Sequence, residues 1–321
     1  MVAPVSSVCS PPPPSRRESS RWCRRIPVFL ILGLLTSGCS VRSLVVSSLA
    51  GSLTGLEDLY RSESDPELVR ESLPGNLKLL DLLILQSPRD VDLLLAACQA
   101  YTTYGYAFVL RDAERVMEKD LTRWRRLRQR ARNHFERAKG YALRALNVRH
   151  EGFSDRFAAD PEAALQDLSR EDVVFLYWLA ASWANLISAS RDDPAALVDL
   201  PRIGMLGERA LELDERFEQG ALHELMVAYY AGRPNRTADD LETARHHFQK
   251  ALEESRGLRA SLFVTYAESV SVRNQDREEF LDMLEKSLAV DVNRDPGSRL
   301  ANLIAQERAR WLKGRVDDLF Y

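Results

Sequence analysis

Histidines are the first candidates for chemistry in this chain, because imidazoles serve both as metal ligands and as general bases. His223 and Glu224 open a segment like the His-Glu-x-x-His helix that binds zinc in metalloproteases. Val227 stands where the second histidine would have to be, so a metal ion would find one ligand there. His246 and His247 are adjacent, which directs their rings to different sides of a helix. We therefore predict no metal site.

Other catalytic patterns are also missing from the sequence. It contains no Gly-x-Ser-x-Gly nucleophile elbow, no glycine-rich phosphate loop and no Cys-x-x-Cys pair. Acidic residues are numerous, but no two of them stand out as an acid–base couple. We predict no catalytic residue and no cofactor, and we expect a protein that is not an enzyme.

Cys39 is the residue with the clearest chemical role. Five arginines between positions 16 and 25 precede an uncharged apolar run at residues 26–35, which is much shorter than the roughly 20 residues of a membrane-spanning helix. This is the layout of a signal peptide, and Thr36, Ser37 and Gly38 then lead directly to Cys39. The pattern resembles the lipobox of bacterial lipoproteins, whose cysteine thiol receives a diacylglyceryl group, although Thr36 occupies the position where leucine is usual. The alternatives are an ordinary secretory signal or an uncut membrane anchor.

This interpretation divides the chain into three parts. Residues 1–38 form the removed signal segment, residues 39–60 the lipidated tether and first helix, and residues 61–321 the helical domain. We expect the anchored protein at the periplasmic face of a bacterial membrane, and Ser40 after the cysteine favours the outer membrane by analogy with lipoprotein sorting. Cys98 lies in an apolar helical context, so we predict a small core residue and not a nucleophile.

Charge argues against a nucleic-acid partner. The chain has 44 basic and 47 acidic residues, a net charge of −3, and removal of the arginine-rich N-terminal segment makes the remainder more acidic. A nucleic-acid-binding domain needs a basic face. The local exception is residues 123–132, where six arginines surround Trp124. We favour a solvated helix face paired with nearby acids, and the alternative is a docking patch for an acidic partner or for lipid headgroups.

Helix-start signals recur after residue 60. Aspartate followed by proline occurs four times, and this pair combines a side chain that caps the backbone N–H groups with a residue that fits the first helical position. Capping boxes are expected at Ser169 and at Thr237. We find no convincing strand pattern. The aspartate–proline pairs are Asp65-Pro66, Asp160-Pro161, Asp193-Pro194 and Asp295-Pro296.

A repeated packing motif specifies the all-α class further. The pattern Ala-x-x-x-Phe-x-x-Ala places small, large and small side chains on one helix face, where a neighbouring helix must approach closely, as in the second helix of a tetratricopeptide repeat (TPR). We therefore predict a superhelix of degenerate TPR-like helix pairs with irregular spacing, against the alternative of a generic helical bundle. The motif occurs at Ala131, Phe135 and Ala138, and again at Ala244, Phe248 and Ala251.

Aromatic residues crowd two helical segments and have two interpretations. They fill the core, or they line an apolar groove or pore between helix pairs, where tyrosine and tryptophan combine an apolar body with a polar tip. The candidates for contact with a ligand or partner are Tyr104, Tyr106, Tyr177, Trp178 and Trp183.

Taken in order, many segments of the chain are similar to the T component of tripartite ATP-independent periplasmic (TRAP) transporters, the TatT family. The similarity covers about residues 65–320. Its segments are 64–70, 73–74, 104–108, 130–131, 141–146, 176–183, 220–224, 244–255, 257, 259–261, 267–272, 276–280, 299–306, 309–312 and 317–320.

The resemblance implies a periplasmic lipoprotein of TPR-like helix pairs that forms a homotrimer. It also implies docking to the periplasmic substrate-binding protein of the transporter, and a pore that passes a hydrophobic or organic-acid ligand. The family's partner contacts are not a short motif, so no contact residue is carried over. The alternative function is a general TPR-like lipoprotein adaptor in cell-envelope assembly.

Overall fold

The computed structural model describes residues 59–190 and 193–321. Within these ranges the chain is all-α, with no strand, which confirms the predicted class. The signal segment and Cys39 lie outside the described residues, so lipidation stays a prediction.

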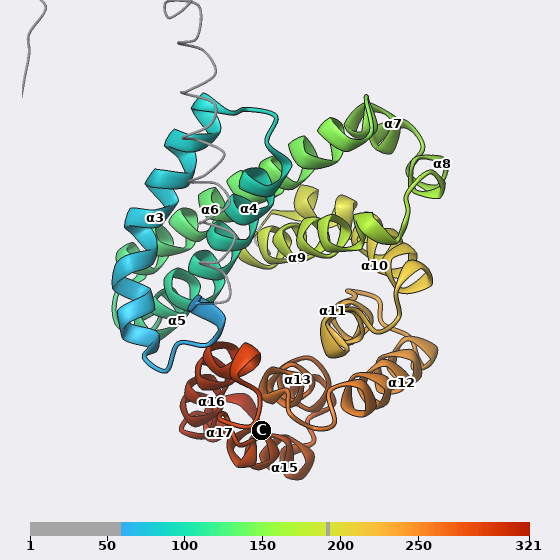
Figure 1. Cartoon of the computed structure of the whole chain (residues 1–321). Helices are drawn as coiled ribbons and strands as arrows, with labels where there is room; N and C mark the ends of the chain where they lie inside the picture. Colours follow the sequence, from blue (N-terminus) through green and yellow to red (C-terminus); the bar gives the residue numbers. More distant parts are fainter. Residues whose placement is uncertain (1–58, 191–192) are drawn as a thin grey trace, which may run out of the picture. The chain divides into compact units, whose positions relative to one another are not determined.

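Helices follow one another with short connections along the whole described chain (Figure 1). Two of the helical segments, η1 and η5, are π-helical, and the other η segments are 3₁₀ turns. The elements are α3 (Pro66–Gln86), α4 (Val91–Tyr104), η1 (Gly105–Leu110), α5 (Arg111–Val116), α6 (Leu121–Arg149), α7 (Phe153–Ala159), α8 (Pro161–Gln166), η2 (Arg170–Asp172), α9 (Val173–Ala189), η3 (Pro194–Asp199), α10 (Leu200–Leu213), η4 (Phe217–Gln219), α11 (Ala221–Gly232), α12 (Ala238–Glu254), α13 (Ala260–Tyr266), η5 (Ala267–Ser271), α14 (Val272–Asn274), α15 (Arg277–Ala289), η6 (Pro296–Ser298), α16 (Arg299–Lys313) and α17 (Val316–Leu319).

The predicted helix starts are confirmed. In each of the four aspartate–proline pairs the aspartate is the N-cap, its carboxylate accepts at least one backbone N–H bond, and the proline is the first helical residue. Ser169 and Thr237 both form capping boxes with the aspartate three positions later. Since each cap satisfies backbone donors that the first turn leaves unpaired, these short motifs fix where the helices begin.

Neighbouring helices along the chain are also neighbours in space. α3 packs on α4, α4 on α6, α6 on α9, and α9 on α10. The series continues with α10 on α11, α11 on α12, and α13 on α15 and α16 (Figure 1). Each helix thus buries an apolar face against the next, which is the local arrangement that paired helices require.

The repeated motif lies at two of these contacts. Ala131, Phe135 and Ala138 face inward from α6 and have no exposed surface. Ala244 and Ala251 of α12 are equally buried, and Phe248 is 6% exposed. The small residues let the adjacent helix approach, and the phenylalanine fills the space between them.

C-terminal helices also contact the beginning of the described chain. α16 packs against α3, and the Arg299 guanidinium donates a hydrogen bond to the Ser62 carbonyl at 2.9 Å. Arg61 forms an ion pair with Glu218 at 2.5 Å. Segments more than 150 residues apart are therefore held together.

Two helical stretches among the described residues are long and apolar enough to cross a bilayer by length and composition. They are residues 91–116 and 170–189, and 67% and 61% of their apolar windows are buried within the protein. Such burial is what a core helix of a folded domain shows, so the two stretches are weak evidence for membrane spans.

Candidate functional site

The first aromatic group predicted for a groove is split between the core and the surface. Tyr104, at the end of α4, is 7% exposed, and its hydroxyl accepts a hydrogen bond from Arg130 at 3.0 Å. Tyr106, two residues later in the π-helical η1, is 38% exposed, and the Arg111 guanidinium lies 4.5 Å from its ring centre. Only Tyr106 of this pair offers a ring to solvent.

The second aromatic group lies on α9. Tyr177 and Trp178 are half-buried and pack edge to face, with ring centres 5.3 Å apart. Phe217 of η4 packs on Tyr177 at 5.3 Å. Trp183 is 7% exposed and is covered by the Lys139 ammonium group 4.4 Å from its ring centre. Tyr177 and Trp178 are thus the partly open members, whereas Trp183 lies in the interior.

A polar cluster neighbours Tyr177. The Glu224 carboxylate accepts hydrogen bonds from Ser261 Oγ at 2.9 Å and Thr265 Oγ1 at 3.0 Å, and Arg259 lies at 3.4 Å. Burial raises the pKa of Tyr177 to about 12, and Glu224 adds to this effect while Arg259 opposes it. The phenol therefore stays protonated at neutral pH. The site can donate one hydrogen bond from the Tyr177 hydroxyl, and its cation, Arg259, is already paired with Glu224. It contains no nucleophile–base couple.

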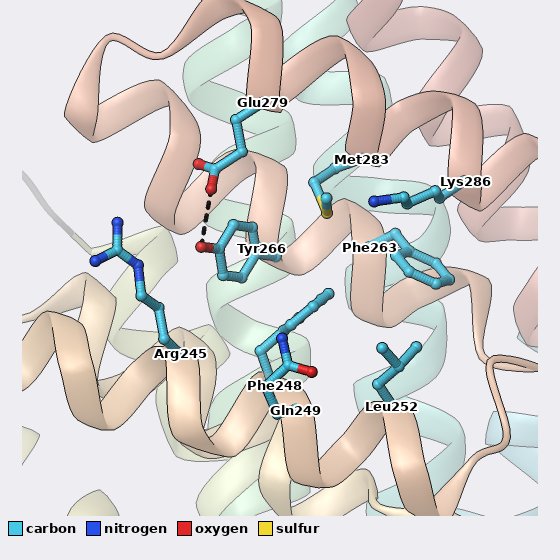
Figure 2. A pocket seen from close by; sticks show the side chains of 9 residues that line it. All are labelled: Arg245, Phe248, Gln249, Leu252, Phe263, Tyr266, Glu279, Met283 and Lys286. Carbon is cyan, nitrogen blue, oxygen red and sulfur yellow. Dashed lines mark hydrogen bonds between the residues drawn. The ribbon is translucent and has the colours of Figure 1, made fainter.

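Figure 2 shows a groove between α12, α13 and α15. Its cavity volume is about 480 Å³. Its floor is formed by Phe248, Phe263, Tyr266 and Met283, each less than 8% exposed. Leu252 completes the apolar lining. This volume is of the order of known small-molecule sites, and Phe248 connects the groove to the predicted packing motif.

Polar side chains line the rim of this groove. Arg245 and Gln249 come from α12, and Lys286 from α15 (Figure 2). The Tyr266 hydroxyl donates a hydrogen bond to Glu279 at 3.0 Å. The edge carries mixed charge, because Glu279 lines it and Lys286 pairs with Asp282 at 2.6 Å. Apolar atoms below such an edge suit an amphipathic acid whose carboxylate meets Arg245 or replaces Asp282 at Lys286.

The structure brings together two histidines that the sequence analysis treated separately. His223 Nδ1 of α11 and His247 Nδ1 of α12 are 2.8 Å apart, so one ring donates a hydrogen bond and the other accepts it. His223 is 3% exposed, and its Nε2 has no hydrogen-bond partner. Burial and the neighbouring histidines His223 and His246 lower the pKa of His247 to about 4. No periodicity pointed to this pair, because its members are 24 residues apart on different helices.

Metal ligation is not supported by the described residues. No group of three or more histidine, cysteine or carboxylate side chains is arranged to hold an ion within residues 59–190 and 193–321. The Cys98 thiol is fully buried, and burial raises its pKa to about 12. It is a core residue, as predicted, and not an activated nucleophile.

Comparison with known proteins gives two matches. The model of a family described as "TRAP transporter T-component" matches residues 62–320. A protein of Treponema pallidum (strain Nichols), whose printed name is "Uncharacterized protein", is 29% identical over 305 residues. That alignment covers 89% of this chain and 94% of the relative. Both matches span nearly all of the described helices, so the similarity concerns the complete domain and not one motif.

Proposed function

Because the chain belongs to the TRAP transporter T-component family, we propose that it is a non-enzymatic scaffold that docks the periplasmic substrate-binding protein of a TRAP-type uptake system. The family match across residues 62–320 carries this proposal. A scaffold requires surface and rigidity and no reactive group, which agrees with a site made of aromatic floors and paired charges.

The proposed architecture is a TPR-like superhelix. Successive packing from α9 to α13 supports it, as do the buried small–large–small faces of α6 and α12. We further propose that Cys39 carries a lipid and holds the domain at the periplasmic face of a bacterial membrane, with the outer membrane favoured, and that the protein assembles as a homotrimer. Such an assembly would present several copies of each docking surface.

The groove of Figure 2 is our candidate for contact with the passing solute. Its apolar floor would take the hydrocarbon part of an organic acid, and Lys286 or Arg245 would meet the carboxylate. Binding of decanoate, measured by isothermal titration calorimetry, tests this role. We expect Met283→Trp to fill the groove and remove binding. Glu242→Trp changes an exposed residue of α12 outside the lining and should retain it.

The docking role is tested by crosslinking in the native host, followed by purification and mass spectrometry. Recovery of a TRAP-type substrate-binding protein with the wild-type chain supports the proposal. A Cys39→Ser chain, which has no acceptor for the lipid, shows whether the anchor is needed. Recovery of envelope-assembly proteins alone, at good yield, would instead favour the general adaptor.

A further inference from the structure

The first half of α6 carries an unusual concentration of positive charge, and four of its six arginines have no ion pair with a described acid. Arg123, Arg125 and Arg126 are exposed, and Arg132 is half-buried. None of these four has an acid within ion-pair distance in the part of the chain that the structure describes. The expectation that acids nearby would pair with this face is therefore wrong for them, although the helix face is solvated as expected.

The acids that precede this face in sequence are already engaged, and Glu136, an exposed acid four residues after Arg132, lies beyond ion-pair distance of that arginine. Asp120 caps α6 by accepting the Arg123 backbone N–H at 2.8 Å. Glu118 pairs with Arg315. Glu114 pairs with Arg111 and Arg308 at 3.1 and 2.5 Å. Arg123, Arg125, Arg126 and Arg132 consequently keep their charge available for a partner outside the fold.

Helical spacing orders the arginines into two rows. Positions 123, 126 and 130 follow an i, i+3, i+7 pattern, as do positions 125, 128 and 132, and the 3.6-residue turn sets the two rows on either side of the exposed face. Thr122, Gln129 and Asn133 fill the row between them. The two rows lie about 160° apart around the helix axis, so they form the cationic flanks of a curved, solvent-facing strip whose centre is polar and uncharged.

Apolar side chains stand beside this strip at the corner between α5 and α6. Leu121 is 57% exposed and Met117 is 43% exposed. Trp124 is half-buried, with the Arg128 guanidinium 5.1 Å from its ring centre. Arginines beside exposed leucine and methionine and a half-buried tryptophan form the composition that protein segments use at a lipid–water interface.

We propose that this arginine face, made of Met117, Leu121, Trp124 and the six arginines at positions 123–132, is a docking surface for anionic phospholipid headgroups. Guanidinium groups pair with phosphate through parallel hydrogen bonds, and a cluster of basic side chains is drawn to an anionic bilayer. Leu121 and Met117 enter between the headgroups. The face holds the domain in a defined orientation on the membrane surface, separately from any lipid on Cys39.

A membrane explains the observations better than an acidic protein or nucleic acid does. Those partners account for the charge but not for two apolar side chains that stay exposed beside it. The whole chain is moreover acidic, with a net charge of −3, so its basic surface for a polyanion is concentrated in this strip and in the arginine-rich residues 16–25, which all the tested variants share. The proposal does not depend on the transport role, because it requires neither a solute-binding protein nor a solute.

Vesicle co-sedimentation tests the arginine face. The full chain with Cys39→Ser, which cannot be lipidated, is mixed with vesicles of phosphatidylglycerol and phosphatidylcholine in equal parts. Replacement of Arg123, Arg125 and Arg126 by glutamine should weaken binding on the order of 10- to 100-fold. The matched control replaces Arg89, Arg294 and Arg310, exposed arginines of three other segments, by glutamine. It removes the same charge and should bind as the parent does.

Three further results decide the proposal. Binding should weaken with added salt, because surface charges are screened, and Leu121→Ser should weaken it at constant charge. Both triple variants retain residues 26–35, so any contribution of that apolar run cancels in the comparison. Equal loss in the two triple variants, equal binding of the parent chain to pure phosphatidylcholine, or binding to heparin without binding to anionic vesicles would overturn the proposal.

Discussion

Asp172 shows how much one buried carboxylate can contribute. It has no exposed surface, and it accepts hydrogen bonds from Arg149 Nε at 2.6 Å, His150 Nε2 at 3.0 Å and the Ser169 backbone N–H at 2.9 Å. These partners outweigh the burial that opposes ionisation and hold its pKa at about 2. Since the pKa is depressed in the folded state, this stabilisation is present above about pH 4 and is lost as the pH falls towards 2.

Replacement of Asp172 by asparagine should therefore destabilise the protein. We expect the free energy of unfolding in urea at pH 7 to fall by about 2–3 kcal/mol, because an amide NH₂ would replace one acceptor oxygen at a fully buried position and leave one of the three donors without an acceptor. Asp167→Asn is the control, since its ion pair with Arg156 is largely exposed and should contribute less than about 1 kcal/mol. Equal losses in both variants would contradict this assignment.

The pair of His223 and His247 predicts a second pH dependence in a milder range. The pKa of both is lowered, in His247 to about 4, with burial as the first cause. In the unfolded chain the histidine pKa is near 6.5, so between about pH 6.5 and 4 the unfolded chain binds protons that the folded pair does not bind. Stability should thus be full above about pH 6.5 and should decrease as the pH falls towards 4.

Urea unfolding of wild type and His247→Gln at pH 7 and pH 5 measures this effect. Over this interval we expect the free energy of unfolding of the wild type to fall by about 1–2 kcal/mol more than that of the variant. A difference of one bound proton between the unfolded and folded states corresponds to about 1.4 kcal/mol per pH unit. His246→Gln removes an exposed neighbour on α12 that contributes least to the lowered pKa of His247, so this variant should keep most of the wild-type pH dependence. Parallel pH profiles for all three proteins would exclude the histidine pair as the cause.

At the scale of elements, two glycines give a sharp contrast. A Cβ added at Gly105 in η1 would lie 2.7 Å from Phe135 Cε1, within a fully packed core. A Cβ added at Gly140 in α6 would meet nothing within 4 Å. Gly105→Ala should lower the free energy of unfolding by about 1–3 kcal/mol through overpacking, whereas Gly140→Ala should raise it by about 1 kcal/mol through helix propensity. Thermal or urea unfolding measures both effects. If both substitutions stabilise the protein, the Phe135 side chain can move aside without cost, which would contradict the overpacking prediction.

Helix starts and inward faces could be predicted from the sequence because the responsible residues are local. Asp65 and Pro66 act within one turn, and Ala131, Phe135 and Ala138 repeat with the helical period. The π-helical segments Gly105–Leu110 and Ala267–Ser271 were not predicted, since one wider turn depends on packing and leaves no residue pattern. For the same reason the sequence could name Phe248 as a packing residue but could not show that it forms part of a groove floor with Phe263 and Met283.

At the scale of the whole molecule, charge pairs connect segments that sequence reasoning cannot bring together. Arg308 of α16 contacts Glu114 of α5 and Glu268 of η5, each at 2.5 Å. Its guanidinium also lies 4.3 Å from the ring centre of Trp311. The Arg308 side chain is 11% exposed, so these contacts form largely out of water. They tie the last long helix to an element 194 residues earlier in the chain.

Arg308→Met should therefore weaken the contact between α16 and the earlier helix α5, while it keeps much of the side-chain volume. We expect a loss of about 3 kcal/mol in the free energy of unfolding, because Glu114 and Glu268 would remain partly buried with one cation fewer. Lys313→Met is the matched control on the same helix, since its pair with Glu285 is about half exposed on both sides and should contribute less than about 1 kcal/mol. If contact between the two ends makes unfolding cooperative, Arg308→Met should also raise hydrogen exchange in α3 and α16 together. Faster exchange in α16 alone, or equal losses in the two variants, would mean that the end-to-end contact rests on the apolar packing of α16 against α3 and not on this charge network.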